Sequence, residues 1–223
     1  MKEVIFADRS EAGRKLAEEL KGRGYGAEPT LVFGIPRGGV IVAAEVARAL
    51  NARLDVTIAR KIRAPHQPEL GIGAVIDGDS SPILNEELLR EVGTSREYLE
   101  REIAFQRREI ERRLQLYRAG RPASEVSGKV AITIDDGIAT GYTFRAALEG
   151  LRRRNPRRLA GAVPVAAYDS VEMLKPFADE LICLSAPSSF FAVGAWYRNF
   201  DQTTDDEVAA ILQRNWSQFE GSL

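Results

Sequence analysis

Short apolar runs alternate along the chain with longer segments whose apolar positions recur every three or four residues. The short runs are predicted strands, and they lie at residues 30–33, 54–59, 130–134, 159–165 and 181–184. The longer segments have the spacing of amphipathic helices, and they lie at residues 40–50, 143–154 and 170–177. Apolar strands separated by helices predict an α/β fold with a parallel sheet covered on both faces. Ligands of such sheets bind at the carboxyl ends of the strands.

Helices are also predicted near both ends of the sequence. Asp8 can cap a helix over residues 8–20, because Glu11 follows three positions later and an apolar stripe runs through the segment. Near the other end, the polar residues 204–207 precede an apolar stretch and predict a second capped helix.

Two segments break the alternation of strands and helices. Residues 62–84 are rich in glycine and proline and carry an Asp-Gly-Asp turn signal at 77–79, so we predict a mobile excursion that can form a hairpin. Residues 95–119 predict a long helix that begins with a capping box formed by Thr94 and Glu97. Its single narrow apolar stripe fits a solvated helix lying on the domain, and it also fits a dimer contact.

The bulk composition excludes several classes of protein. The chain has 223 residues, of which 44% are hydrophobic, and this is enough to bury a substantial core. The formal net charge is −1 and neither half is strongly basic, so we expect no nucleic-acid partner. No run approaches the ~20 apolar residues of a membrane span. The single cysteine, Cys183, lies in a predicted buried strand and is expected to be an inert thiol. We therefore expect a cytoplasmic protein without a membrane partner.

The strand at 130–134 is followed directly by two acids, Asp135 and Asp136, and then by a loop of small residues that opens a helix. Backbone amides and the helix dipole can bind a phosphate there without a lysine. Carboxylates accept hydrogen bonds, so the acids suit a vicinal diol. The stretch can hold a sugar phosphate, although a strand end whose Asp caps the next helix gives the same pattern. The loop residues are Gly137, Ile138, Ala139, Thr140, Gly141, Tyr142 and Thr143.

Two further strand ends carry groups that suit anions. Arg37, Gly38 and Gly39 follow the first strand and form an amide-rich turn with a cation, or else a tight turn in which the glycines serve geometry alone. Arg60 and Lys61 follow the second strand, as two cations at the expected crevice or as a solvated pair. Together, the three strand ends predict a diol site, a phosphate site and a more highly charged anion site.

The segment VAITIDDGIATGYT, residues 130–143, resembles the phosphoribosyl-pyrophosphate signature of the type I phosphoribosyltransferase family. Residues 35–39 resemble the pyrophosphate loop of that family, and Arg60 with Lys61 resembles its basic pair. The glycine-rich excursion stands where the family keeps a flexible active-site loop. The overall pattern is most similar to stand-alone bacterial proteins known only as predicted phosphoribosyltransferases.

The resemblance implies a parallel sheet core flanked by helices, with a small hood and a long-helix insertion, in a single domain over residues 1–223. The implied parts are a core at about 28–185, a flexible loop at about 62–84, a helical insertion at about 85–120 and a hood and tail at about 186–223.

The resemblance also implies roles for the strand-end residues. Asp135 and Asp136 would hold the ribose hydroxyls, and residues 137–143 would cradle the 5-phosphate. Arg37 and the amides of the two following glycines would meet the pyrophosphate together with Mg²⁺, which binds mainly through substrate oxygens. The Pro36–Arg37 peptide would be cis, as is frequent in this loop of the family.

The implied activity is transfer of the 5-phosphoribosyl group from phosphoribosyl pyrophosphate to a nitrogenous acceptor, with release of pyrophosphate, in a protein that is usually a homodimer. The alternative is a non-catalytic protein that senses phosphoribosyl pyrophosphate or a nucleotide in the same crevice. Arg37, Arg60 and Lys61 favour catalysis, because a sensor need not retain a site for the leaving group. His66, in the excursion, could act as an acid or ligand, or could be an exposed histidine without a role.

The acceptor is not identified by the resemblance. Ala139 and Arg198 stand where hypoxanthine-type members carry acids, and this argues against a 6-oxopurine. Flat rings stack on flat bases, so an aromatic cluster after the last strand provides candidate acceptor contacts. Packing within the hood explains the same cluster equally well. Its rings are Phe190, Phe191, Trp196 and Tyr197.

Overall fold

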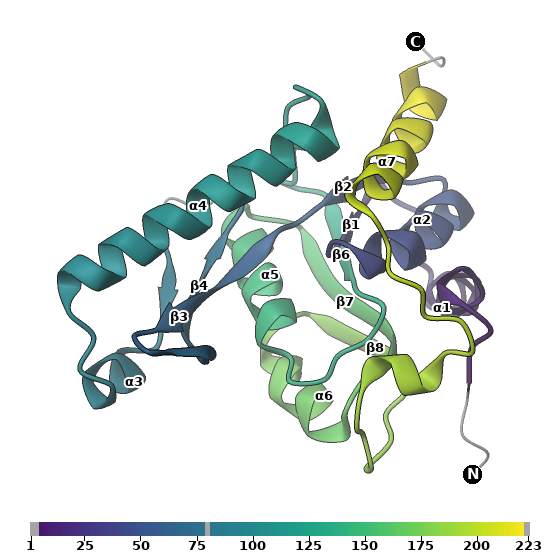
Figure 1. Ribbon diagram of the computed structural model, residues 1–223. Helices are drawn as coiled ribbons and strands as arrows, with labels where there is room; N and C mark the ends of the chain where they lie inside the picture. Colours follow the sequence, from purple (N-terminus) through teal and green to yellow (C-terminus); the bar gives the residue numbers. More distant parts are fainter. Residues whose placement is uncertain (1–4, 79–80, 221–223) are drawn as a thin grey trace.

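A central sheet of five parallel strands organises the chain, in the order β2-β1-β6-β7-β8 (Figure 1). The computed structural model describes residues 5–78 and 81–220. The strands are β1 (Thr30–Gly34), β2 (Arg53–Val56), β6 (Val130–Ile134), β7 (Arg158–Val165) and β8 (Glu180–Ser185). The predicted α/β fold with a parallel sheet is confirmed.

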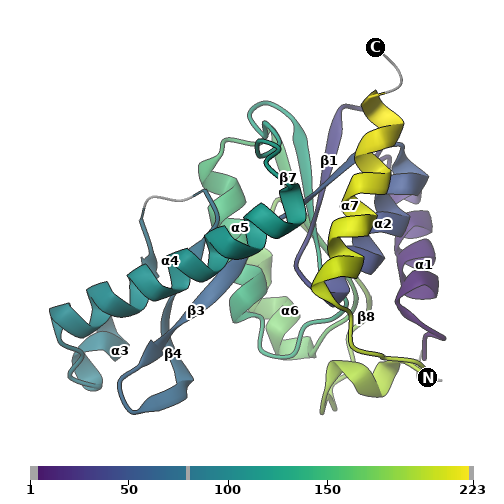
Figure 2. The ribbon, with the colours of Figure 1, turned by 45° about the horizontal axis from the view of Figure 1, so that its top comes forward.

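Helices cover both faces of this sheet, as the apolar strands require. Figures 1 and 2 show one group of helices on one side of the sheet and a second group on the other. The first group is α1 (Arg9–Gly22), α2 (Gly38–Leu50) and α7 (Asp205–Glu220), and the second is α5 (Tyr142–Arg153) and α6 (Tyr168–Leu174), which a short 3-10 turn (Lys175–Phe177) follows. Along β1, Val32 packs in one core cluster, whereas Leu31 and Phe33 pack in the other. This alternation follows from the two-residue repeat of a strand.

The predicted helix caps near the two ends are present. The Asp8 side chain accepts a hydrogen bond from the Glu11 amide at 2.7 Å. At α7, the Thr204 hydroxyl accepts from the Glu207 amide at 3.2 Å, and the Glu207 carboxylate accepts from the Thr204 amide at 2.7 Å. Both ends of this capping box are therefore satisfied.

The glycine-rich excursion forms a second, antiparallel sheet. Its strands are β3 (Ala59–Ala64), β4 (Gln67–Ile76) and β5 (Ile83–Leu84). The expected hairpin is therefore present, with an exposed turn that contains His66. Of the turn predicted at 77–79, Asp77 and Gly78 do form a turn, and Asp79 lies outside the described residues. Ile62 and Ile72 are fully buried, so the excursion packs against the main core.

One strand prediction is wrong. The run at 54–59 is divided between two sheets, because β2 ends at Val56 and β3 starts at Ala59. The Asp77 carboxylate accepts hydrogen bonds from the Ile58 amide at 2.7 Å and from the Thr57 hydroxyl at 3.1 Å. These bonds come from a residue about twenty positions away, so the apolar run itself gives no sign of the break.

The long predicted helix is α4 (Arg96–Arg118), and a short helix that the sequence pattern missed, α3 (Glu86–Glu91), precedes it. The capping residue of α4 is Ser95, whose hydroxyl accepts from the Tyr98 amide at 3.2 Å, and the expected Thr94–Glu97 box is not formed. The Thr94 hydroxyl is instead buried without a partner among the described residues. The sequence pattern places the cap one residue too early.

The polar side of α4 is bonded to the hairpin beneath it. Gln106 accepts from Arg60 Nε at 2.6 Å, and Glu102 accepts from Arg63 Nε at 2.7 Å. Gln106 and Glu102 are buried and bond to each other at 2.8 Å. The helix is thus fastened to the excursion by polar contacts as well as by its apolar stripe. The alternative of a dimer contact stays a prediction.

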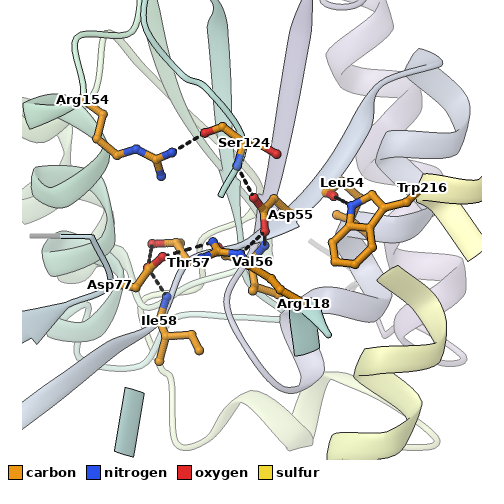
Figure 3. Close-up of polar contacts among 10 residues, drawn as sticks. All are labelled: Leu54, Asp55, Val56, Thr57, Ile58, Asp77, Arg118, Ser124, Arg154 and Trp216. Carbon is orange, nitrogen blue, oxygen red and sulfur yellow. Dashed lines mark hydrogen bonds and ion pairs between the residues drawn. The ribbon is translucent and has the colours of Figure 1, made fainter. Parts of the chain in front are cut away.

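A buried ion cluster ties the end of α4 to both sheets (Figure 3). Arg118 donates to Asp55 Oδ1 at 3.0 Å, to Asp77 Oδ2 at 3.2 Å and to the Val56 carbonyl at 3.1 Å. The Arg118 side chain is 8% exposed and each carboxylate is 2% exposed. Asp55 also accepts from the Ser124 amide at 2.9 Å. Burial raises the pKa of Asp77, and the charge of Arg118 opposes this rise.

Replacing Arg118 by Met should leave two buried carboxylates without their cation. Removing one partner of a buried ion pair typically costs about 3–5 kcal/mol, so the free energy of unfolding should fall by that amount. Urea denaturation measures the loss. Arg108→Met, on an exposed position of the same helix, is the matched control and should change stability by about 0.5 kcal/mol or less. Equal effects of the two substitutions would contradict the assigned role of the cluster.

Candidate functional site

Two loops meet at one edge of the parallel sheet because their strands are neighbours. β1 and β6 pair in register, with Gly34 opposite Ile134. The pairing continues one step further, since the Ile35 amide donates to the Ile134 carbonyl at 2.8 Å. The residues that follow each strand, 35–39 and 135–141, therefore start side by side. The structure brings together the two strand ends that the sequence pattern had singled out.

The glycines of the first loop lie in contact with the acids of the second. A Cβ atom on Gly39 would lie 2.8 Å from the Cα atom of Asp135 and 3.0 Å from the Ile134 carbonyl oxygen. A Cβ atom on Gly38 would overlap Asp136 Oδ2. Real Cβ atoms do not approach this closely, so both positions need glycine. The Pro36–Arg37 peptide is cis, as the resemblance implied.

The acid pair is held by bonds from three different parts of the chain. The Asp136 amide donates to Asp135 Oδ1 at 2.8 Å, and Arg9 Nε donates to Asp136 Oδ2 at 2.7 Å. The Tyr197 hydroxyl donates to the Asp136 carbonyl oxygen. Burial and, next, the negative charge of Asp136 raise the pKa of Asp135 well above its usual value. The repulsion between two adjacent carboxylates, together with burial, disfavours the state in which both are ionised.

The small-residue loop is held by two hydrogen bonds to neighbouring segments, and three of its backbone amides are left free in the described part of the chain. The Ile138 amide donates to the Val165 carbonyl at 3.0 Å, and the Ser170 hydroxyl donates to the Ala139 carbonyl at 2.6 Å. The amides of Ala139, Thr140 and Gly141 have no acceptor among the described residues. Helix α5 begins at the next residue. Free amides at a helix N-terminus are able to bind an anion, and the phosphate site at this loop stays a prediction.

The hydroxyl-bearing side chains of this loop are also exposed to solvent. Thr140 and Thr143 are exposed, and Tyr142 is 71% exposed. Gly141 has a φ of 78°, a conformation that side chains rarely adopt, and this turns the chain into α5.

Of the predicted cations, only Arg37 lies in a strand-end loop of the parallel sheet. Arg37 precedes α2, and its side chain makes no hydrogen bond or ion pair with any described residue. Arg60 and Lys61 lie within β3, so their placement at the end of a parallel strand is wrong. Arg60 is partly buried against α4, and its pKa is lowered first by burial and then by the charge of Arg113.

Two arginines near these groups were missed by the sequence pattern. Arg9 is 127 positions from its partner Asp136, and no local motif marks it. Arg113, on α4, has a buried Nε atom without a partner in the described part of the chain. Neither residue lies in an apolar run or a glycine loop. Only the tertiary structure shows where they are.

The aromatic cluster is divided between packing and exposure. It lies between β8 and α7, in residues 186–204, which we call the hood. Trp196 and Tyr197 are each 6% exposed, Trp196 stacks on Phe190 at 6.1 Å between ring centroids, and Tyr197 contacts Phe200 at 5.1 Å. Burial therefore favours the packing explanation for these two rings. Phe191 is 98% exposed and stays available to a ligand.

The remaining chemical groups add little to the site. Burial raises the pKa of Cys183 to about 11, and its thiol donates to the Ser185 carbonyl, which agrees with an inert thiol. Within residues 5–78 and 81–220, no group of three or more His, Cys, Asp or Glu side chains could hold a metal ion. No helix in the same part of the chain is long and apolar enough to cross a membrane.

Comparison with known sequences identifies the family. The family model described as "Phosphoribosyl transferase domain" matches residues 7–195. The chain belongs to the phosphoribosyltransferase family. A Mycobacterium tuberculosis protein named "Putative phosphoribosyl transferase" is 41% identical over 215 residues, which cover 96% of this chain and 48% of that protein. This phosphoribosyltransferase chain thus spans about half the length of the curated relatives that it matches.

Solved structures share the fold of this chain. The crystal structure of TT1426 from Thermus thermophilus is 45% identical in sequence, with a TM-score of 0.82, and the match covers 94% of this chain and 98% of that chain. A Neisseria gonorrhoeae protein solved with bound ppGpp has 13% identity and a TM-score of 0.53, over 96% of this chain and 98% of that chain. The second likeness concerns the fold alone.

Asp135 gives this phosphoribosyltransferase domain a testable pH dependence. Its folded-state pKa is raised, so the unfolded chain releases the proton more readily as the pH rises above about 4, and the free energy of unfolding falls. Asp135→Asn cannot ionise and keeps the acceptor oxygen. Its stability advantage over the wild type should grow between about pH 4 and pH 8 in urea denaturation.

Glu18→Gln, at an exposed position of α1, serves as the control and should follow the wild type at both pH values. A stability difference between Asp135→Asn and the wild type that stays constant across this range would show that the Asp135 proton is not bound more tightly in the folded state.

Proposed function

We propose that this chain is a phosphoribosyltransferase domain that transfers the 5-phosphoribosyl group from phosphoribosyl pyrophosphate to a small nitrogenous acceptor, with release of pyrophosphate. The observation that carries the proposal is the close contact of the glycine loop with the acid pair. The contact supports an anion site beside acceptors for hydroxyl groups, at the sheet edge where a parallel α/β fold binds ligands.

The acid pair suits the two hydroxyls of a ribose. One oxygen of each carboxylate is already occupied, Asp135 Oδ1 by a backbone amide and Asp136 Oδ2 by Arg9. No N–H group of the described residues bonds to the second oxygen of either acid. The side chains of Asp135 and Asp136 also bond to each other, and we propose that the two ribose hydroxyls would replace this contact with one acceptor for each hydroxyl. Hydrogen bonds to charged acceptors contribute about 1.5–3 kcal/mol each.

The two ends of the donor would be held by amides and a cation. The free amides of Ala139, Thr140 and Gly141 would receive the 5-phosphate. The Arg37 guanidinium, which makes no hydrogen bond or ion pair with the described residues, would pair with the pyrophosphate beside Gly38 and Gly39. Arg60 and Lys61, on the hairpin, are proposed as additional cations for the same group.

Mg²⁺ fits this arrangement as a substrate-bound ion. It prefers oxygen ligands and commonly keeps few protein ligands. Since the described residues include no cluster able to hold a metal by themselves, its ligands would come mainly from pyrophosphate and ribose oxygens. When bound, Mg²⁺ would neutralise charge on the leaving pyrophosphate.

In the proposed reaction, the bond between the anomeric carbon and the pyrophosphate oxygen breaks, and the acceptor nitrogen forms the new bond to that carbon. The electron pair leaves with pyrophosphate, and the acceptor loses a proton. The acids orient the ribose while positive charge develops on its ring. Arg37 stabilises the departing negative charge. Exposed Phe191 is the ring proposed to contact the acceptor.

The same crevice would serve a protein that only senses the donor or a nucleotide, and this is the alternative outcome of the tests below. We also propose that the chain forms a homodimer, as the family resemblance implies. From the composition, we propose a cytoplasmic protein without nucleic-acid or membrane partners. The single-domain organisation with a hood belongs to the same proposal.

The diol assignment predicts that replacing Asp135 and Asp136 together by Asn weakens donor binding about 100-fold or more, because each acid loses one acceptor oxygen and the pair loses its negative charge. Calorimetry with phosphoribosyl pyrophosphate and Mg²⁺ measures the change. Asp206→Asn, an exposed acid of α7, is the control and should bind like the wild type. Unchanged affinity in the double variant would show that the acids do not bind the ribose.

A panel of bases and amines distinguishes the enzyme from the sensor. The wild-type chain with donor and Mg²⁺ should release pyrophosphate with at least one acceptor, and Arg37→Gln should lower the rate by about 10- to 100-fold, because the leaving group loses its cation. Enzyme-coupled detection of pyrophosphate gives the readout. Clear donor binding without turnover by any acceptor would favour the sensor.

A further inference from the structure

We propose that Arg9, in the first turn of α1, is a positioning residue of the donor site that sets the acid pair for recognition of the ribose diol. The inference rests on the proposed function and adds a residue outside all the loops that the family resemblance marks. Its basis is the geometry around Asp136.

The ion pair between Arg9 and Asp136 is enclosed and well directed. Arg9 Nε lies 2.7 Å from Asp136 Oδ2, and the two side chains are 11% and 14% exposed. Ion pairs at exposed sites contribute little, but this pair is largely removed from water. Its charge therefore acts on Asp136 with little screening.

The Arg9 guanidinium is fixed by two further contacts from the C-terminal part of the hood. Its carbon lies 3.8 Å above the centroid of the Phe200 ring, and its Nη1 donates to the Asp201 carbonyl at 2.7 Å. Phe200 in turn packs against Tyr197, whose hydroxyl bonds to the Asp136 backbone. Both the side chain and the backbone of Asp136 are thus set by one packed group. The planar guanidinium can make the stacked contact and both hydrogen bonds together, which an ammonium cannot.

Gly38 provides the space for this pair. A Cβ atom there would overlap Asp136 Oδ2 and lie 2.6 Å from Arg9 Nε. The glycine of the predicted pyrophosphate loop is consequently needed where Arg9 meets the acid. This contact links Arg9 to the loop that receives the other end of the donor.

The consequence is a specific orientation of the free oxygen. Arg9 occupies Oδ2 of Asp136, so Oδ1 is the oxygen left to accept a ribose hydroxyl. The charged groups that face this carboxylate are Arg9, from α1, and Asp135, from its own loop, and the hood contributes the Tyr197 phenol. Without Arg9, two like charges would stand side by side with no cation bonded to either. The carboxylate would then turn away, and this change removes an acceptor.

The experiment measures how well the protein distinguishes ribose 5-phosphate from 2-deoxyribose 5-phosphate, by NMR titration, which detects weak binding. The wild type should prefer the ribose compound by about tenfold, because one hydrogen bond to a charged acceptor is lost with the deoxy sugar. Arg9→Gln should lower the preference to about twofold or less, whereas Arg9→Lys should keep a preference of about fivefold. Affinity for pyrophosphate alone should stay within about twofold in both variants.

Arg14→Met, on the same helix, is the matched control, since Arg14 is 52% exposed and lies 4.0 Å from its nearest acid. It should keep the full preference of the wild type. A full preference in Arg9→Gln, or a lysine variant no better than the glutamine variant, would overturn the role of Arg9. If the glutamine variant does not fold, the lysine variant decides the question alone, and a preference of about twofold or less in Arg9→Lys would overturn the role of Arg9. Failure of the wild type to bind or distinguish the two sugars would instead overturn the diol assignment, and with it the proposed function.

Discussion

The parallel pairing of β1 with β6 is the constraint on which the site depends. It makes the loops after these strands neighbours, although about a hundred positions separate them in sequence. Once paired, the loops have room for each other only if glycine stands at 38 and 39. The proposed chemistry depends on this proximity, because it brings the backbone of the glycine loop against the pair of acids. A shift of register by one residue would turn every side chain after the strand to the opposite face.

Buried polar groups set the positions of α4 and the hairpin relative to the central sheet. The cluster of Arg118 with Asp55 and Asp77 joins α4, the hairpin and the sheet, and the bonds from Arg60 and Arg63 to α4 continue this connection along the helix. Buried charges cost free energy unless they are paired and hydrogen-bonded, and the cluster meets both conditions. These contacts are directional, whereas apolar packing alone would allow α4 to slide along the hairpin.

Apolar period and glycine placement were enough to predict most of the fold. They located the parallel strands, the helices on both faces and the two loops that meet at the sheet edge. They did not predict the break at Thr57 and Ile58, where hydrogen bonds to the Asp77 carboxylate separate the end of β2 from the start of the second sheet. They also failed for Arg9, whose role depends on a contact across 127 positions, and for the burial of Trp196 and Tyr197. Local patterns report local structure, whereas these features arise from contacts between distant segments.

The contact between the glycine loop and the acid pair has a consequence for how such sequences can change. A larger residue at 38 would displace Asp136 and Arg9, and one at 39 would displace the backbone of Asp135. No substitution at one of these positions is independent of the others. The two loops and the first turn of α1 therefore form one evolutionary unit. A substitution in one of these segments is expected to persist only when compensating substitutions occur in the others. The exposed ring of Phe191 lies outside that unit, so this position can change while the acids, the glycines and Arg9 are retained.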